Sequence, residues 1–149
     1  MIRLLERQFD VPVPLNDAWR FLAQVEAWPR WAGHIRRIEV TPPGEIGPGS
    51  SGRIHLRNGI RSTFRMLEFR PGMNWKWAGP FLWLTVHYDH RFDALTPRRT
   101  RLTWVVDAEG LGAGLLGRVF AAVYARNLDK AIPALISSIG PVNRGGGGA

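Results

Sequence analysis

The sequence predicts an α+β fold, in which a curved antiparallel β-sheet carries helices on one face. Two observations favour this fold. Turn signals divide residues 34–109 into about six short strand-like segments, which is typical of antiparallel hairpins. Two short helical segments precede these strands, and one long helical segment follows them. When helices lie before and after a run of strands in the sequence, and do not alternate with them, they pack on one face of an antiparallel sheet.

A strand, two short helices and a second strand account for the first part of the chain. Residues 2–11 alternate loosely between polar and apolar side chains, as a strand does. After Pro14, apolar side chains recur at the spacing of one helical face, at Leu15, Ala18, Trp19, Leu22 and Val25. Pro29 starts a new helical turn between two tryptophans, and the alternating residues 34–41 predict the next strand.

The second part of the chain is a series of strands that ends in a long helix. The segment 41–52 is rich in Pro, Gly and Ser and predicts a loop. A change of phase between Met66 and Leu67 predicts a β-bulge. A glycine-spaced segment then leads into a helix over about 115–139. We expect residues 1–140 to form a single domain and residues 141–149 to form a flexible, Gly-rich tail. The predicted strands lie near 53–57, 60–69, 74–77, 82–95 and 100–108.

Composition excludes several classes of function. The chain has no cysteine, which excludes disulfides, thiolate metal sites and cysteine nucleophiles. It lacks an apolar run long enough for a signal peptide or a membrane span, so we expect a cytoplasmic protein. The net charge is +8, and only Lys76 and Lys130 among the basic residues are not arginine. Because the arginines are scattered, nucleic-acid binding is not favoured, whereas transient contact with an anionic membrane surface stays open. Codon usage in a GC-rich genome is an alternative source of the arginine excess.

Two segments, in their order along the chain, resemble a known superfamily. These are FDVPVPLNDAWRFLAQVEAWPRW (9–31), with its W-P-x-W turn, and HRFDALTPRRTRLTWVVDAEG (90–110), which precedes a Leu/Ala-rich helix. Together they resemble the START/birch-pollen-allergen-like (SRPBCC) superfamily, and most closely its polyketide cyclase/dehydrase and lipid transport family. The resemblance covers residues 2–139. It implies a helix-grip fold, in which the sheet wraps around the C-terminal helix and leaves a hydrophobic cavity between them, and it implies no cofactor.

Strand alternation and helical periodicity predict which side chains would line such a cavity. In the strands, the side chains on the apolar side should face inward, and they include Tyr88 and His90. On the long helix, Phe120, Val123, Tyr124, Ala131 and Ala134 should be buried around Asn127 at the centre of the face. Two alternatives stay open: the tryptophans fill a core, and Asn127 makes only a structural hydrogen bond. The predicted ligand-binding set is Trp28, Trp31, Phe64, Trp75, Trp77, Tyr88, His90, Trp104, Phe120, Tyr124 and Asn127.

No known catalytic motif is present, and His90 is the best single acid–base candidate. His87 and Asp89 share a strand face, but no third metal ligand accompanies them, so we predict no metal site. Our leading hypothesis is a monomer or homodimer that binds a polyketide-like, lipid-like or aromatic molecule. It would act either as a cyclase or dehydratase with His90 as a proton shuttle, or as a non-catalytic carrier or sensor. A further alternative is an interaction module that uses basic side chains on its outer surface, at Arg36, Arg37, Arg98 and Arg99.

Overall fold

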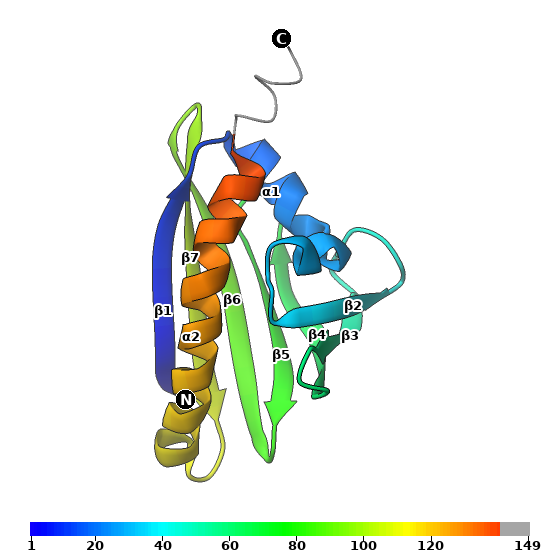
Figure 1. Ribbon diagram of the computed structural model, residues 1–149, viewed down its shortest axis with the longest axis vertical. Helices are drawn as coiled ribbons and strands as arrows, with labels where there is room; N and C mark the ends of the chain where they lie inside the picture. The colour runs from blue at the N-terminus through cyan, green and yellow to red at the C-terminus, as the bar shows by residue number, and fades with distance from the viewer. Residues whose placement is uncertain (141–149) are drawn as a thin grey trace.

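The computed structural model describes residues 1–140 and consists of one seven-stranded antiparallel sheet with helices on its concave side (Figure 1). The strand order is β1-β7-β6-β5-β4-β3-β2, so the first and last strands of the chain are neighbours. The predicted α+β architecture is therefore confirmed. The elements are β1 (Ile2–Val11), α1 (Leu15–Ala23), the 3-10 helix η1 (Val25–Arg30), β2 (Ile35–Thr41), β3 (Ser51–Leu56), β4 (Arg61–Arg70), β5 (Asn74–Phe81), β6 (Leu84–Thr96), β7 (Arg99–Glu109) and α2 (Ala113–Ile139).

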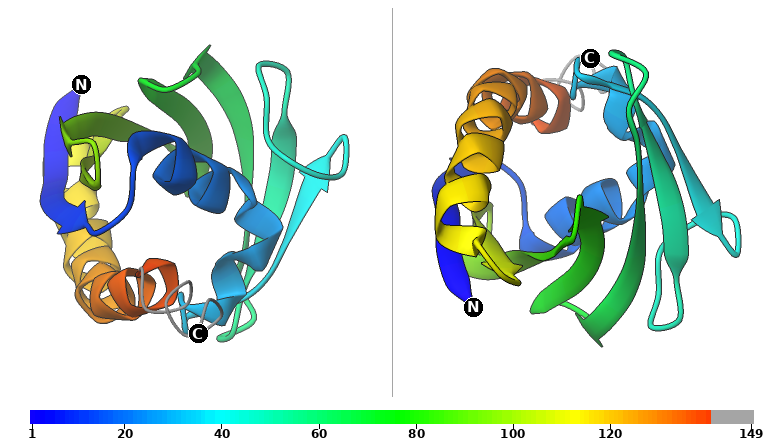
Figure 2. Two further views of the ribbon diagram at one scale, coloured as in Figure 1. Left: turned by 90° about the horizontal axis from the view of Figure 1, so that it is seen from above. Right: turned by 90° about the horizontal axis from the view of Figure 1, so that it is seen from below.

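The sheet is strongly curved, and the sheet and the helices together form a ring in cross-section. In the views along the long axis, the sheet runs from β1, beside α2, around to β2 and β3 on the far side (Figure 2). The predicted bulge is confirmed, because the register between β4 and β5 shifts between Met66 and Glu68. A bulge of this kind increases local twist and helps a sheet to bend.

The inward face carries the aromatic side chains that strand alternation predicts. Trp75 and Trp77 on β5 are 0% and 3% exposed, and Trp104 on β7 is also buried. Trp19 of α1 makes an edge-on contact with Trp75 at a ring distance of 5.0 Å. In the described part of the chain, the tryptophans other than Trp83 all belong to this aromatic core. The alternative that the tryptophans fill a core therefore applies to most of these residues.

The predicted rotation of α2 is wrong. The fully buried residues of this helix form a different stripe: Ala113, Gly117, Leu128, Ala131, Leu135 and Ile139. Asn127 is half-buried and lies about 80° of helical rotation from the centre of this stripe, and Val123 is 60% exposed. The cause is a close contact with β1: a Cβ atom on Gly117 would lie 2.7 Å from the side chain of Leu4. The helix therefore turns its glycine, and not its larger side chains, toward this strand.

Candidate functional site

A small pocket lies between α2, η1 and the concave face of the sheet. Its volume is about 30 Å³, which is room for about two water molecules. Sites for drug-sized ligands measure about 300–1,000 Å³, so the ligand-sized cavity implied by the family resemblance is not open in this structure. The pocket is lined by Trp28, Trp31, Ala32, His34, Ile35, His90, Trp104, Tyr124, Leu128 and Ala131.

The pocket lies on a seam between two packing units. Helix α2 packs mainly on β1, with a smaller contact to β7, whereas η1 packs mainly on β2. The two walls are therefore attached mainly to opposite ends of the sheet, because β1 and β2 are its end strands.

His90 is a neutral hydrogen-bond acceptor at the base of the pocket. Its Nδ1 lies 3.3 Å from the carbonyl oxygen of Trp75, and four indole rings surround it at ring distances of 4.8–6.1 Å. Because a carbonyl oxygen only accepts, Nδ1 carries the proton and Nε2 is left with its lone pair. Burial lowers the pKa of His90 to about 4, although the Trp75 carbonyl and Asp89 oppose this effect. His90 is therefore not a proton donor near neutral pH, which argues against the proton-shuttle hypothesis in this closed state.

Two further groups of the pocket are hydrogen-bond donors, the Trp104 indole and the Tyr124 phenol. The Trp104 indole N–H is buried and has no hydrogen-bond partner among the described residues. Burial raises the pKa of the Tyr124 phenol well above its usual range, so this group keeps its proton. By contrast, the Trp28 indole N–H already donates to the carbonyl oxygen of Leu22 over 2.9 Å. The pocket is thus lined by a tryptophan whose N–H is unpaired and by a tyrosine that keeps its proton, in aromatic surroundings.

The structure brings together five of the eleven predicted ligand-binding residues. Trp28, Trp31, His90, Trp104 and Tyr124 line the pocket. The others lie behind this set or farther along α2. Phe64 and Trp75 contact Trp77, which itself lies 4.8 Å from His90 between ring centroids. Tyr88 and Phe120 each contact the ring of Tyr124, and Asn127 lies on the flank of α2. Their roles in ligand binding stay predictions.

Sequence reasoning missed four residues that line the pocket, Ala32, His34, Ile35 and Leu128, whereas Ala131 was predicted to be buried on the long helix. Leu128 could have been found from Tyr124, because positions 124, 128, 131 and 135 are spaced like one helical face. Ala32, His34 and Ile35 follow the W-P-x-W turn, and no periodicity marks them as inward-facing. Burial lowers the pKa of His34, so the pocket contains a second neutral imidazole.

Outside this pocket, the described residues form a larger pocket and no metal site. Asp89 is buried on the outer face of the sheet, where it accepts hydrogen bonds from Asn74 and Arg91 at 2.8 Å each. Among residues 1–140, no group of three or more His, Cys, Asp or Glu side chains is placed to hold a metal ion. A larger and more open pocket, of about 210 Å³, lies along β4 and β5, and Arg65 is its only ionisable lining residue. We favour the smaller pocket because it lies between α2 and the concave face of the sheet and is lined by two histidines and a tyrosine.

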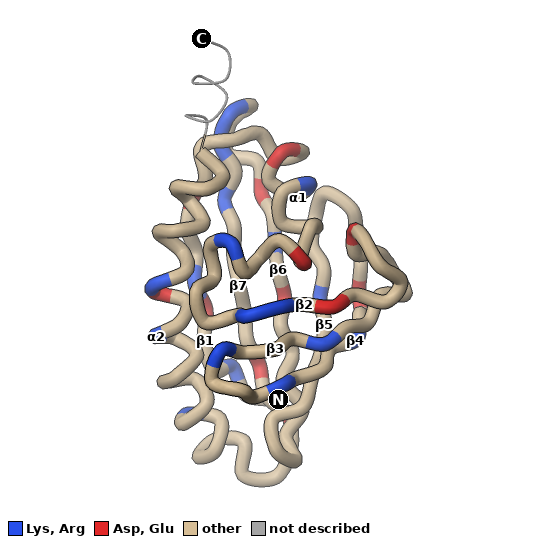
Figure 3. The backbone as a smooth tube through the Cα atoms, turned by 45° about the vertical axis from the view of Figure 1, so that its right-hand side comes forward, with Lys and Arg blue, Asp and Glu red and all other residues tan. Residues whose placement is uncertain are grey.

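The basic residues are distributed over several elements. Figure 3 shows Lys and Arg on β2, β3, α2 and the β6–β7 hairpin, with acidic residues among them. Several arginines are paired: Arg101 with Asp10 at 2.9 Å, and Arg3 with Asp107 at 2.6 Å. The locations of the arginines do not test the hypothesis of an interaction module, which therefore stays a prediction for Arg36, Arg37, Arg98 and Arg99.

Comparison with known protein families gives one match that covers most of the chain. A family model described as polyketide cyclase / dehydrase and lipid transport matches residues 3–135. Among curated proteins, the uncharacterized protein Rv2574 of Mycobacterium tuberculosis is 28% identical over 68 residues, which are 46% of this chain and 41% of that protein. The chain therefore spans less than half the length of the curated relatives that it matches.

Solved structures show the same fold at low sequence identity. The Zhui aromatase/cyclase from Streptomyces sp. R1128 has a TM-score of 0.66 at 20% identity, over 91% of this chain and 92% of that one. A START superfamily protein from Mycobacterium smegmatis has a TM-score of 0.68 at 15% identity, over 92% and 99% of the two chains. A hypothetical protein, jhp0584 from Helicobacter pylori, has a TM-score of 0.74 at 12% identity, over 89% and 85%. These likenesses confirm the helix-grip fold.

Proposed function

Because the chain belongs to the polyketide cyclase/dehydrase and lipid transport family, we propose that it binds a flat, hydrophobic small molecule rich in hydrogen-bond acceptors. The site is the pocket between α2 and the sheet. The observation that carries this proposal is the pair of hydrogen-bond donors, Trp104 and Tyr124, in aromatic surroundings. The Trp104 N–H has no partner among the described residues, and the Tyr124 phenol stays protonated. A carbonyl or ether oxygen would satisfy either group, whereas a plain hydrocarbon would leave the buried N–H unpaired.

Binding requires the seam to open, because a polycyclic molecule does not fit into about 30 Å³. The weakly joined walls of the seam support such a movement, with α2 and η1 attached to different parts of the sheet. The indoles of Trp28 and Trp31 contact each other at a ring distance of 5.5 Å and form one wall. Because their planes are inclined at 48°, one indole would stack on the flat face of the ligand and the other would contact its edge.

Two activities are compatible with this site. A carrier or sensor would release its ligand unaltered. A cyclase or dehydratase would need a group that removes a proton, and the Nε2 of His90 is in the form that accepts one. Native mass spectrometry of the freshly purified protein distinguishes the two, since a carrier retains unchanged ligand and an enzyme retains product. If an accepted substrate is found and His90→Phe turns it over at the wild-type rate, the role of His90 as a base is wrong.

A matched pair of fluorescent probes tests the chemistry of the pocket. The probe 2-acetylanthracene carries a ketone acceptor, and 2-ethylanthracene has the same flat ring system without an acceptor. We expect the wild-type protein to bind the ketone more tightly. Replacing Trp104 with Phe keeps an aromatic ring but removes the N–H, which should weaken ketone binding about fivefold and leave the ethyl probe unaffected. Equal effects on both probes would contradict a directed hydrogen bond from Trp104.

Blocking the pocket tests its location. Ala131 is 2% exposed and lines the pocket from α2. The substitution Ala131→Leu should abolish binding of both probes, because the added carbon atoms occupy the space that the ligand needs. Ala122→Leu places the same side chain on the exposed face of the same helix and should leave binding unchanged. If Ala131→Leu binds the probes as the wild type does, the ligand lies elsewhere and the proposal fails.

A further inference from the structure

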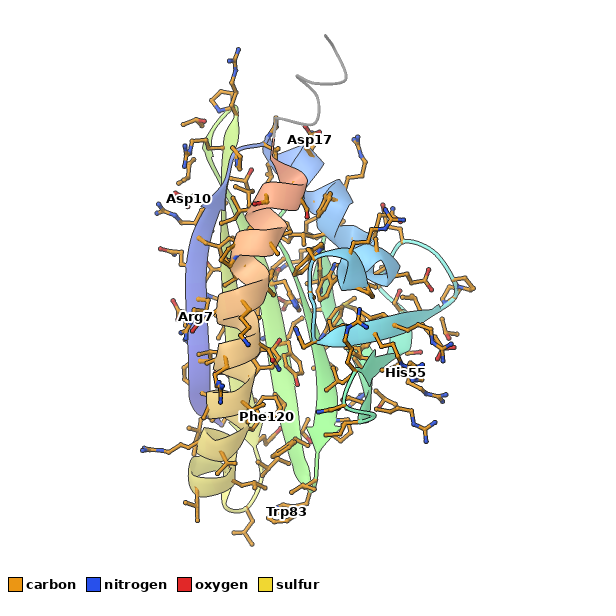
Figure 4. The ribbon with its side chains drawn as sticks, viewed as in Figure 1. Arg7, Asp10, Asp17, His55, Trp83 and Phe120 are labelled. Carbon is orange, nitrogen blue, oxygen red and sulfur yellow. The ribbon has the colours of Figure 1, made fainter. Side chains whose placement is uncertain are left out.

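One end of the molecule exposes large apolar side chains on adjacent turns. Leu82 and Trp83 form the β5–β6 turn and are each 67% exposed. Leu111 and Leu115, where β7 leads into α2, are 89% and 80% exposed. Trp83 lies at the lower extremity of the molecule, beside the start of α2 (Figure 4). We call the set Leu82, Trp83, Leu111, Leu115, Val119 and Val123 the apolar end.

The apolar end continues along α2 as a stripe. Val119 and Val123, 59% and 60% exposed, follow Leu115 at intervals of four residues and so lie on the same outward side of the helix. An exposed helical face is normally polar. Here the outward side of the first half of α2 is mainly apolar, which marks it as a contact surface.

The exposed side chains are held in place. The indole N–H of Trp83 donates to the carbonyl oxygen of Leu111 over 2.8 Å, which ties the β5–β6 turn to the start of α2. Leu82 has a φ of 54°, in the left-handed region that Gly and Asn adopt far more readily than Leu. An apolar residue thus occupies a backbone conformation that disfavours it, at a position where it stays mostly exposed.

The charges around the apolar end are suited to an anionic surface. Within α2, the only acidic residue is Asp129, and its carboxylate is paired with Arg7 at 3.0 Å. Arg118 and Arg126 are exposed on the outward side of the helix. Next to the apolar end, the carboxylate of Glu109 lies 3.3 Å from Nε2 of His87. Exposed cations thus accompany the apolar stripe, while these acidic groups already have partners.

We infer that the apolar end docks the protein on an anionic lipid membrane, with Leu82, Trp83, Leu111 and Leu115 inserted at the interface. Protruding turns with a Trp and several Leu side chains suit the lipid–water boundary, and arginines beside them attract anionic headgroups. In the described part of the chain, no helix is both long enough and apolar enough to cross a membrane. The contact is therefore peripheral. It does not depend on ligand binding, because none of these residues lines the pocket.

Vesicle flotation tests the inference. The full chain is mixed with phosphatidylcholine vesicles that contain or lack phosphatidylglycerol, and the fraction that floats is measured. We expect binding that is stronger with phosphatidylglycerol and that weakens as salt is raised. The double variant Leu82→Asn, Leu115→Gln should bind at least tenfold more weakly. Its folding should be preserved, because Asn suits the backbone at position 82 and Gln is a good helix former. Circular dichroism and thermal unfolding check this.

The matched control is Leu95→Gln, which removes a 41% exposed leucine from the β6–β7 hairpin at the opposite end. It should float like the wild type. The inference is overturned if the wild type does not bind either vesicle, or if the double variant binds as the wild type does. It is also overturned if the wild type self-associates in light scattering and the double variant does not, since the apolar end would then contact a second copy of the chain. If the proposed function is right, the double variant binds the fluorescent probes as tightly as the wild type when no vesicles are present. This holds whichever flotation result is obtained.

Discussion

Acid should destabilise this protein through His90. The folded protein holds the pKa of His90 at about 4, whereas an unfolded chain restores a value of about 6.5. Between these two values the unfolded state binds more protons, so the free energy of unfolding falls as the pH falls. The stabilisation is complete above about pH 6.5 and is lost by about pH 4. That interval corresponds to about 3 kcal/mol, which is a large part of the stability of a typical domain.

Urea unfolding, followed by far-ultraviolet circular dichroism at several pH values between 7 and 4, measures this effect. Carboxylates also contribute at the acid end, so the wild type is compared with His90→Gln, which cannot titrate. The variant should lose less stability between pH 6.5 and pH 4, by about the 3 kcal/mol assigned to His90. His87→Gln removes a histidine from the outer side of the same strand and controls for a general effect of substitution. Equal pH dependence in the wild type and His90→Gln would refute the burial argument, as would an NMR titration of His90 near pH 6.5.

Two further substitutions test the packing of the sheet. Gly52→Ala would place a Cβ atom 2.5 Å from the ring of Phe64 and from a backbone oxygen. We therefore expect the free energy of unfolding to fall by about 1–3 kcal/mol, as measured by thermal unfolding. In the control Gly49→Ala, the added Cβ meets no atom within 4 Å, so stability should not change. Asn74 donates to Glu68 at 2.7 Å and to Asp89 at 2.8 Å. Asn74→Ala should therefore cost about 2–3 kcal/mol in urea unfolding. Near-wild-type stability in either variant would contradict the geometry.

The strands were predictable because their side chains alternate with high contrast. Trp75 and Trp77 alternate with Asn74 and Lys76, and only one assignment of the two faces buries the indoles. His90 was placed inward by the same logic, and its burial follows. The alternation does not predict the pKa of His90, because this pKa depends on burial by four tryptophans from three separate elements. Strand alternation therefore predicted the inward position of His90, whereas its neutral state depends on packing that the sequence pattern does not show.

The rotation of α2 was not predictable because the helix lacks such contrast. Small and apolar side chains occur on all sides of it, and the outward stripe that includes Leu115 and Val119 is as apolar as the buried one. Periodicity alone favoured a face centred on Asn127. The contact between Gly117 and Leu4 decides the rotation, and it joins residues more than 100 positions apart. Sequence periodicity also does not predict the volume of the pocket, because this volume depends on how the aromatic rings pack.

The two proposed surfaces lie on one helix, which determines how their tests should be read. The first half of α2 carries the outward stripe, and its second half closes the pocket with Leu128 and Ala131. A substitution at Leu115 touches solvent only, so it changes the pocket only if the whole helix shifts. Probe affinity measured without vesicles detects such a shift directly. A loss of vesicle binding with unchanged probe affinity therefore locates the defect in the apolar end, whereas a loss of both indicates that α2 has moved on β1.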